Sequence, residues 1–580
     1  MKFMDLLCEL ISAARGEIEV DLLIQGADIA NTISGEIHKA DIAIHKGRVV
    51  GFDCCSAQEI LDLDGSLIVP SFIDGHVHVE SSMVTIPEYA RAIVPRGTTT
   101  VIIDPHEIAN VMGLNGIMYM LKSSMYVPLN VFLMLSSCVP ATNFETSGAV
   151  LDTTAMKKII GHKQVLGLAE MMNYPGVINR DHVLLEKIKL AGTKRIDGHC
   201  PHLTGKDLAA YIVPGIKSDH ESTSLSEAAE KLRKGMYIMV REGSTAKNLK
   251  DLLPLINPVN SRQFLFVSDD RNAADILNEG HIDFMVRTAI LEGLDPILAF
   301  QIASLNAAQY FGLNDLGAIA PGFRADLVAL DNLVDLHILK VIKDGRLVAD
   351  GGRFLAKLKM VPRPTRSKMR IANIDLISFE INAVSSKARV IGLVKDQLTT
   401  KSLVCDVQPK DGKVESDINR DILKMAVVER HLATGNIGLG LVHGFGLRVG
   451  SIASSVAHDS HNIVVIGTTS KEMLAAVLAM KEMNGGLVVI RDGKAVARLK
   501  LPIAGILSDM PLNFVADSIG ICIEAAHDLG CSLEDPFMAL SFLCLPVIPE
   551  LKLTDKGLVD VASFDFVPLF VRDQEIGATS

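Results

Sequence analysis

The chain has 580 residues, of which 48% are hydrophobic and 22% are charged, and its formal net charge is 57 − 68 = −11. This length exceeds that of one ordinary domain, and the composition is typical of a large, well-buried α/β enzyme and excludes a disordered or coiled chain. No block rich in lysine and arginine occurs, so we expect no nucleic-acid partner.

Residues 1–17 have the apolar spacing of a short amphipathic helix. Asp5 and Glu9 interrupt any signal-peptide core, and no run of about 18 apolar residues occurs that could cross a membrane. The nine cysteines are scattered and form no C-x-x-C pair, which favours reduced thiols over a disulfide framework. We therefore expect a cytoplasmic protein with no membrane partner.

Two separate segments, residues 18–70 and 313–360, share one style, in which apolar and polar residues alternate between turn residues. This alternation is typical of strands with one buried face. We interpret the two segments as halves of one small β-sandwich, split in the sequence because another domain is inserted into it.

Residues 71–312 alternate apolar, β-rich runs with helix-like stretches, several of which stop at a glycine. Eight strands are expected, beginning near residues 72, 98, 130, 165, 194, 216, 237 and 263. Eight strands, each followed by a helix over about 240 residues, predict a (β/α)8 barrel of the TIM type.

The last part of the chain differs from the barrel in pattern. Residues 361–369, VPRPTRSKM, are rich in proline and basic residues and predict a linker. Residues 370–580 mix strands and helices, and we interpret them as a separate α+β domain that packs near the active site. The fold class is therefore α/β, with an additional C-terminal α+β domain.

Side chains that bind metals stand at the C-terminal ends of the expected barrel strands, where the active sites of such barrels lie. His76 and His78 end the first strand and share one face, because side chains alternate along a strand. A single histidine at a strand end is more often structural, but that interpretation requires independent coincidences at several strands. The complete set of expected ligands is His76, His78, Glu170, His199, His220 and Asp269.

Four histidines, one glutamate and one aspartate suit two divalent ions that share a bridging carboxylate. Glu170 lies within the apolar sequence LGLAEMM, where a carboxylate needs a partner. The spacing alone does not choose among zinc, manganese and ferrous iron. Two other zinc signatures are missing, since neither H-E-x-x-H nor H-x-E with P-C-x-x-C occurs.

These features resemble the amidohydrolase superfamily, and PGFRADLVALD (321–331) is similar to the segment that closes its sandwich after the barrel. Many members carry a carbamylated lysine on strand four, where this chain has Glu170. The motifs FIDGHVHVESSM, DPHEIANVMG, LGLAEMMNYPGV, IDGHCPHLTG, VAHDSHNIVVIG and LPVIPELKLTDKGLVDV resemble, in order, those of the bacterial adenine deaminase family. The resemblance covers nearly the whole chain.

The resemblance implies hydrolysis of adenine to hypoxanthine and ammonia in purine salvage, at a binuclear centre where Mn²⁺ or Fe²⁺ is favoured over Zn²⁺. A divalent ion lowers the pKa of water from about 15.7 toward 7, which supplies a nucleophile at neutral pH. The expected catalytic residues are Asp269, which moves the proton of the attacking water toward the leaving ammonia, with His220 and Glu107. Glu107, Glu80 and His202 are the candidates for protonating ring N1.

Further polar residues on the expected loops are candidates for contact with the substrate. Arg241 and Glu242 end strand seven and could instead pair with each other, and residues 457–462 could be a surface turn. The family resemblance favours a C-terminal domain that lends polar residues to the site. The candidate set is Glu80, Ser82, Met83, His106, His202, Arg241, Glu242, His458, Asp459 and His461.

Two alternatives stay open at this point. One is another amidohydrolase that opens a cyclic amide, against which Glu170 argues because it replaces the lysine of the carbamate-dependent members. The other is a non-catalytic protein that uses the fold for assembly, against which six competent ligand positions argue. We also expect a homo-oligomer, namely a homodimer.

Overall fold

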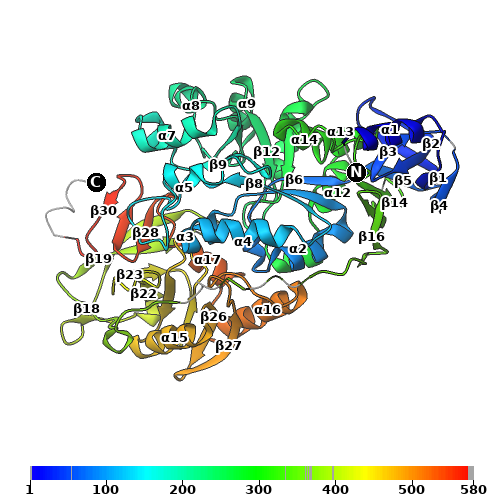
Figure 1. Cartoon of the computed structure of the whole chain (residues 1–580). Coiled ribbons are helices and arrows are strands. Elements are labelled where there is room, and N and C mark those ends of the chain that lie inside the picture. Colours follow the sequence, from blue (N-terminus) through cyan, green and yellow to red (C-terminus); the bar gives the residue numbers. More distant parts are fainter. Residues whose placement is uncertain are drawn as a thin grey trace.

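Figure 1 shows a computed structural model of the chain. The structure describes residues 3–571, apart from positions 54, 334, 360, 362, 365–368, 395 and 396. The predicted linker at 361–369 therefore lies largely outside the described residues. Among the described residues, none of the helices has both the length and the apolar character needed to cross a membrane.

One nine-stranded sheet joins two segments that are distant in the sequence, and it lies at one end of the molecule (Figure 1). β5 and β14 pair antiparallel at the junction, with Val69 opposite Val328. Apolar residues from both segments, such as Ile42, Ile68 and Leu327, share one buried core. The strands are β1 (Val20–Asn31), β2 (Glu36–His45), β3 (Arg48–Gly51), β4 (Ala57–Asp62), β5 (Leu67–Pro70), β14 (Leu327–Leu330), β15 (Ile338–Lys343), β16 (Arg346–Asp350) and β17 (Arg353–Phe354), with helix α1 (Phe3–Ala14) against β3.

The segment between these halves forms two parallel sheets. The first sheet has the strands β6 (Phe72–Val77), β7 (Thr98–Ile103), β8 (Asn130–Leu135), β9 (Val165–Met171) and β10 (Arg195–Gly198). The second has β11 (Ser218–Asp219), β12 (Tyr237–Arg241) and β13 (Phe264–Val267). The predicted parallel α/β architecture is thus confirmed as mixed α/β structure with a parallel half-barrel sheet.

Backbone hydrogen bonds cross both gaps between the two sheets. At one gap the Lys217 amide donates to the Ile196 carbonyl at 3.0 Å, and at the other the Asp269 amide donates to the His76 carbonyl at 3.0 Å. Residues of β6 and β7 are buried on both faces, as is typical of parallel strands covered by helices. One face carries an apolar core shared by six of the strands: Ile73, Ile102, Met134, Ala169, Met239 and Leu265.

Helices follow these strands and pack on their other face. Several begin at a side-chain cap, for example Asp181 at α7 and Ser224 at α9, whose oxygens accept backbone amides. The helices are α2 (Ile86–Ile93), α3 (His106–Met112), α4 (Leu114–Ser124), α5 (Thr153–Lys157), α6 (Tyr174–Ile178), α7 (His182–Ala191), α8 (Gly205–Ile212), α9 (Leu225–Arg233), α10 (Leu249–Leu252), α11 (Ala273–Asn278), α12 (Ile282–Leu291), α13 (Pro296–Ile302) and α14 (Leu305–Phe311).

The C-terminal part of the chain is built on an eight-stranded sheet. Its strands are, in sheet order, β20 (Thr400–Asp406), β19 (Lys387–Leu393), β23 (Ile437–His443), β22 (Ile422–Val428), β25 (Ile463–Gly467), β24 (Ser451–Ser454), β26 (Gly486–Arg491) and β27 (Lys494–Lys500). Three helices pack around it: α15 (Ser470–Met483), α16 (Leu512–Asp528) and α17 (Pro536–Phe542). Two small sheets complete it, β18 (Ile381–Asn382) with β21 (Lys413–Val414), and β28 (Leu551–Thr554), β29 (Gly557–Asp560) and β30 (Asp565–Phe566).

This C-terminal part lies against the loops that follow the parallel strands (Figure 1). The Ser508 amide donates to the Met83 carbonyl at 2.7 Å, and the Thr146 amide donates to the Asp555 carboxylate at 2.8 Å. The loops that carry the predicted metal ligands are therefore covered by residues from the far end of the chain.

Candidate metal centre and active site

Asp269, just after β13, forms backbone hydrogen bonds with the end of β6 and the residue after it. The Asp269 amide donates to the His76 carbonyl at 3.0 Å, and its carbonyl accepts the His78 amide at 3.2 Å. Asp269 has φ = +53°, a left-handed conformation that costs a non-glycine residue about 1–3 kcal/mol and must be held by the surrounding structure. This backbone pairing brings the Asp269 carboxylate to the two imidazoles of the H-x-H motif.

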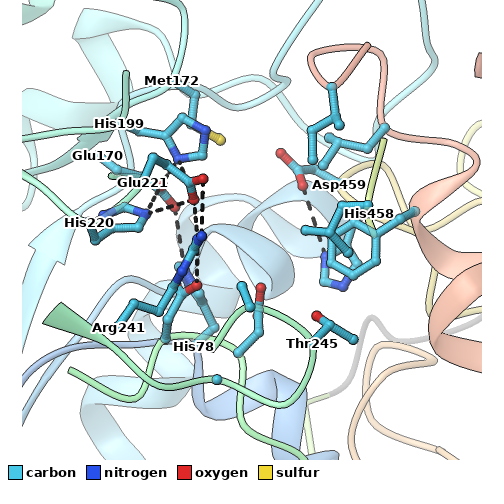
Figure 2. Close-up of a pocket in the computed structure, with 18 of the residues that line it drawn as sticks. His78, Glu170, Met172, His199, His220, Glu221, Arg241, Thr245, His458 and Asp459 are labelled. Atoms are coloured by element: carbon cyan, nitrogen blue, oxygen red, sulfur yellow. Dashed lines mark hydrogen bonds and ion pairs between the residues drawn. The ribbon is translucent and has the colours of Figure 1, made fainter. Parts of the chain in front are cut away.

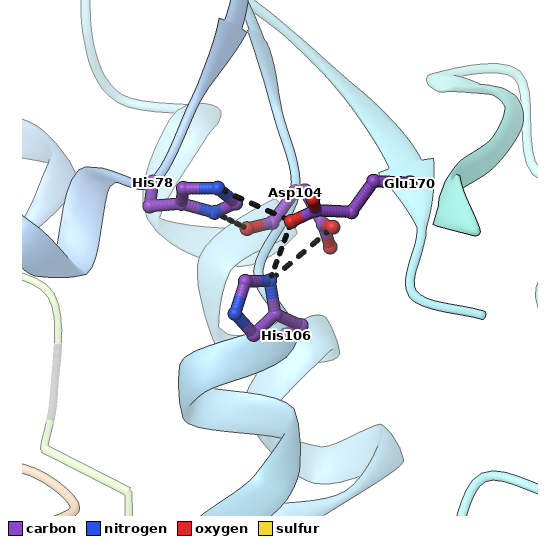
Figure 3. Close-up of side chains that lie close together, drawn as sticks. All are labelled: His78, Asp104, His106 and Glu170. Carbon is purple, nitrogen blue, oxygen red and sulfur yellow. Dashed lines mark hydrogen bonds and ion pairs between the residues drawn. The ribbon is translucent and has the colours of Figure 1, made fainter. Parts of the chain in front are cut away.

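The first group of ligand atoms converges around His78. Its Nε2 atom lies 3.1 Å from His76 Nε2, 3.2 Å from Asp269 Oδ1 and 3.4 Å from Glu170 Oε1. Its Nδ1 atom lies 3.0 Å from the Asp104 carbonyl oxygen, so Nδ1 carries a proton and donates it to this oxygen, while Nε2 faces the other ligand atoms. A backbone carbonyl that fixes the tautomer in this way is the usual support of a metal-bound histidine. Figure 3 shows His78 and Asp104 gathered with Glu170 and His106.

The second group meets the other oxygen of Glu170. Glu170 Oε2 lies 2.7 Å from His199 Nδ1 and 3.3 Å from His220 Nε2. Glu170 itself is only 3% exposed, and its two oxygens face different imidazoles. His76, His78 and Asp269 form one group that could hold a metal ion, and Glu170 lies between this group and the imidazoles of His199 and His220.

Arg241, at the end of β12, holds two carboxylates of the site in place. Its guanidinium binds both oxygens of Glu221 and also lies 3.3 Å from Asp269 Oδ2. Burial favours the neutral form of Asp269, but hydrogen bonds from His76 and His78 outweigh it and hold the pKa of Asp269 well below its usual range. Asp269 is thus ionised.

Glu221 was not among the predicted site residues. Its Oε1 atom lies 3.7 Å from His199 Nδ1 and 3.5 Å from His220 Nε2. Burial raises the pKa of Glu221, but the charges of Arg241, His199 and His220 together outweigh burial and lower the pKa. The sequence does hold a signal for it, because Glu221 directly follows a ligand histidine, just as Glu107 follows His106.

Two histidines of the C-terminal part bind the carboxylate of Glu107. His458 Nδ1 contacts one oxygen and His461 Nε2 contacts the other. The Ala457 amide donates to His461 Nδ1 at 3.1 Å, so Nε2 of that ring carries its proton and donates to Glu107. Burial opposes a charge on His458, but Glu107 raises the pKa of His458 to about 9.

The segment 457–462 is not the surface turn that one interpretation of the sequence allowed. His458, Asp459 and His461 are all buried, and the His458 ring stacks on Phe542 with centroids 4.6 Å apart. This segment joins β24 to β25, and its side chains bind Glu107 and line the cavity described below.

A small cavity of about 50 Å³ lies between these groups. Figure 2 shows His199, His220, Glu170 and Glu221 on one side of it, with His458 and Asp459 across from them. The predicted residues that line it are His78, His106, Glu107, Glu170, His199, His220, Arg241, Asp269, His458 and Asp459. Lining residues that were not predicted include Glu221, Asp270, Met172, Thr245, Leu398 and Phe542.

The structure does not bring every predicted residue to this cavity. His202 has a side chain that is 77% exposed and lies 3.7 Å from Glu227. Glu242 accepts the Leu249 amide at 3.0 Å and does not form the suggested pair with Arg241. Both residues are therefore placed outside the cavity.

Residues 80–83, in the loop after β6, and two further histidines do not line the catalytic cavity. Glu80 accepts the Ile108 amide at 3.2 Å, and Ser82 donates to the Val79 carbonyl at 2.6 Å within the short 3-10 helix η1 (Val79–Ser82). Met83 lines a separate, neighbouring cavity. His76 and His461 are buried and do not line the cavity; His76 Nε2 lies 3.1 Å from His78 Nε2, and His461 Nε2 contacts Glu107.

Comparisons with known proteins cover both parts of the chain. Residues 67–348 match the model of the amidohydrolase family, and residues 397–565 match that of the adenine deaminase C-terminal domain. The adenine deaminase of Desulfatibacillum aliphaticivorans is 51% identical over 565 residues, which is 97% of this chain and 99% of that protein. Those of Methanothrix thermoacetophila and Carboxydothermus hydrogenoformans (adenine deaminase 2) are 49% and 47% identical, again over 97% of this chain and 99% of each relative.

Proposed function

Since this chain belongs to the adenine deaminase family of amidohydrolases, we propose that it hydrolyses adenine to hypoxanthine and ammonia. One observation carries this proposal. Two groups of imidazole and carboxylate ligands share Glu170 beside a pocket that also contains an ionised aspartate. Such a site activates water and provides a base for it, which is what displacement of an amine from an aromatic carbon needs.

We infer that the two parallel sheets form one closed (β/α)8 barrel, which supports the site from below. The hydrogen bonds across both gaps and the core shared by six strands support this inference. The corresponding domains are the N-terminal helix (1–17), the composite β domain (18–70 and 313–360), the barrel (71–312) and the C-terminal domain (370–580).

Two divalent ions fit the ligand groups, and we propose Mn²⁺ or Fe²⁺ in preference to Zn²⁺. His76, His78 and Asp269 would hold one ion, His199 and His220 the other, and Glu170 would bind both. When bound, the ions supply an activated water at neutral pH. The ligands contain nitrogen and oxygen but no thiolate, which agrees with manganese or iron.

Asp269 acts as the base in this proposal, and Arg241 orients it. The water oxygen adds to C6 of adenine, and the water proton moves to Asp269 while ring N1 gains a proton. Asp269 then returns its proton to the exocyclic nitrogen, the C6–N bond breaks and ammonia leaves. The proton left on the C6 oxygen returns to the group that protonated N1 as the carbonyl forms, so the product keeps the proton on N1 and the oxygen on C6, which is hypoxanthine. His220 assists by holding the Glu170 side of the site, 3.3 Å from its carboxylate.

The proton for ring N1 comes from the pair of Glu107 and His458. Of the three candidates from the sequence, only Glu107 lines the cavity, since Glu80 and His202 do not. His458 lines the cavity too and keeps its proton up to a pH of about 9. The pair therefore holds a transferable proton at neutral pH next to the substrate position.

The test is an assay of ammonia release with metal-reconstituted protein. Adenine should give ammonia and hypoxanthine in equal amounts, whereas hydantoin and dihydropyrimidines should stay closed. Ring opening of a cyclic amide without ammonia release from adenine would instead support the alternative amidohydrolase. We further propose that the protein is a homodimer, which light scattering of the purified protein would test. We also propose that it acts in purine salvage in the cytoplasm, since the scattered cysteines favour a reducing compartment.

A further inference from the structure

A second and larger cavity lies beside the catalytic pocket. Its volume is about 450 Å³, which is within the range of about 300–1,000 Å³ typical of small-molecule sites. The catalytic pocket, at about 50 Å³, has room for only a few water molecules, each of which needs about 10–15 Å³ on this measure. A purine therefore reaches the ligand groups only if a wall of the small pocket moves. We call the larger space the outer cavity.

Three residues line both spaces and so form the wall between them: Thr245, Leu398 and Phe542. Thr245 follows β12 on the barrel side. Leu398 precedes β20 and Phe542 ends α17, so both apolar residues of the wall come from the C-terminal part. Because the two spaces share this wall, a substrate held in the outer cavity would lie directly beside the catalytic pocket.

A buried lysine ties the two apolar wall residues together. Lys552 is 0% exposed, and its Nζ atom donates to the carbonyls of Leu398 and Phe542, each at 3.0 Å. Burying an ammonium is costly unless it is hydrogen-bonded, and burial lowers the pKa of Lys552 to about 7. An apolar residue would fill this position at lower cost, so the lysine is explained by the two carbonyls that it holds.

The outer cavity has an acidic lining. Its described lining includes four acidic residues, Asp275, Glu279, Glu534 and Asp535, and one lysine, Lys247; Glu279 is paired with Arg271 at 2.6 Å, which leaves three carboxylates against Lys247. A surface of one predominant sign disfavours ligands of the same sign. Its apolar side chains, such as Leu533 and Met538, suit a flat heterocycle. The lining thus favours an uncharged base over a phosphorylated nucleotide.

We propose that the outer cavity is where the uncharged purine base first binds, and that Lys552 positions the wall of Leu398 and Phe542 through which the base passes to the catalytic pocket. The inference rests on the proposed function and names a binding site and a positioning residue for it. Lys552 touches no reacting atom in this proposal and acts only through the wall.

The first test fills the outer cavity. Ala539 lines it but does not line the catalytic pocket, so Ala539→Trp should lower kcat/KM for adenine at least tenfold while the bound metal stays at the wild-type amount. Leu478→Trp is the matched control, because Leu478 is 46% exposed on α15 and lines neither cavity. The control should keep kcat/KM within twofold.

The second test removes the lysine bonds. Lys552→Met should raise KM for adenine at least fivefold with kcat within twofold, because the wall loses its anchor while the catalytic groups stay in place. Lys424→Met is the control: Lys424 is also buried in the C-terminal part, but it binds Glu415 and Ser470, each at 2.7 Å, away from both cavities. The control should leave KM and kcat unchanged even where it lowers the melting temperature.

The outcomes separate this inference from the function on which it rests. If the wild-type protein releases no ammonia from adenine, the proposed function is overturned and this inference falls with it. If the wild type is active but the folded Ala539→Trp and Lys552→Met variants keep wild-type kcat/KM and KM, only the role of the outer cavity is overturned. Should one variant fail to fold, the other decides.

Discussion

Replacing Glu170 by glutamine tests the central feature of the site, the carboxylate shared by two ligand groups. One oxygen of Glu170 lies 3.4 Å from His78 Nε2, and the other lies 2.7 Å from His199 Nδ1 and 3.3 Å from His220 Nε2. The amide is neutral, and its nitrogen cannot bind a cation. One of the two groups therefore loses a ligand, and both lose a negative charge.

The size of the effect follows from the two proposed metal contacts of Glu170, one with each ion. A hydrogen bond or ligand contact to a charged group contributes about 1.5–3 kcal/mol, so two such contacts contribute about 3–6 kcal/mol. Because about 1.4 kcal/mol corresponds to a tenfold change, we expect Glu170→Gln to weaken metal binding by about 10²–10⁴-fold. Ammonia release from adenine should fall by a similar factor.

The assay measures bound metal after dialysis, together with ammonia release. Glu242→Gln is the matched control, since Glu242 is a buried glutamate just after β12 that lines no part of the catalytic pocket and whose carboxylate accepts the Leu249 amide. It should keep both metals and nearly full activity. A Glu170→Gln protein that binds two metals with wild-type affinity and turns over adenine normally would refute the bridging role.

Three further predictions follow from the same geometry. Asp269→Asn should lower kcat by about 10²–10⁴-fold, the usual contribution of a general base, while most of the metal stays bound; unchanged kcat would rule out proton transfer by this residue. Dialysis against a chelator should abolish ammonia release and lower the melting temperature, because ligands bound only by the folded state stabilise it, and Mn²⁺ should restore both; a chelated protein with full activity would contradict a metal requirement. The pKa of His458 is raised from about 6.5 to about 9, so its charged form stabilises the fold fully below pH 6.5 and this contribution disappears as the pH rises through 9. Urea unfolding of the wild type and of His458→Asn should therefore differ most below pH 6.5 and least above pH 9, and a gap that does not change with pH would show that His458 is not charged in the fold.

The clustering of the proposed ligand residues could be predicted because their positions depend on local periodicity. His76 and His78 are two apart, so their side chains share one face of β6 wherever the strand lies. Glu170 and Asp269 stand at or just after strands whose apolar pattern is unambiguous. The ends of parallel strands meet on one side of a sheet, so the order of elements alone brings these residues together.

The loop residues could not be placed in the same way. His202 follows β10 shortly after the proposed ligand His199, and Glu242 follows β12 next to Arg241, yet the His202 side chain is exposed and the Glu242 carboxylate accepts a backbone amide of the following loop. Glu221 reaches the site only because Arg241, from another strand, binds it. These orientations depend on φ, ψ and hydrogen bonds that no periodic pattern encodes.

By itself, then, the amino-acid sequence determined the parallel strands and the positions along them of the histidines and carboxylates that could bind a metal. Only the tertiary structure decided how the pocket is closed, because Glu107 meets His458 across 351 positions of the chain and Lys552 holds the wall from a distant strand. Such contacts arise when one domain docks on another, and docking depends on the complementarity of two surfaces rather than on the repeat of either sequence.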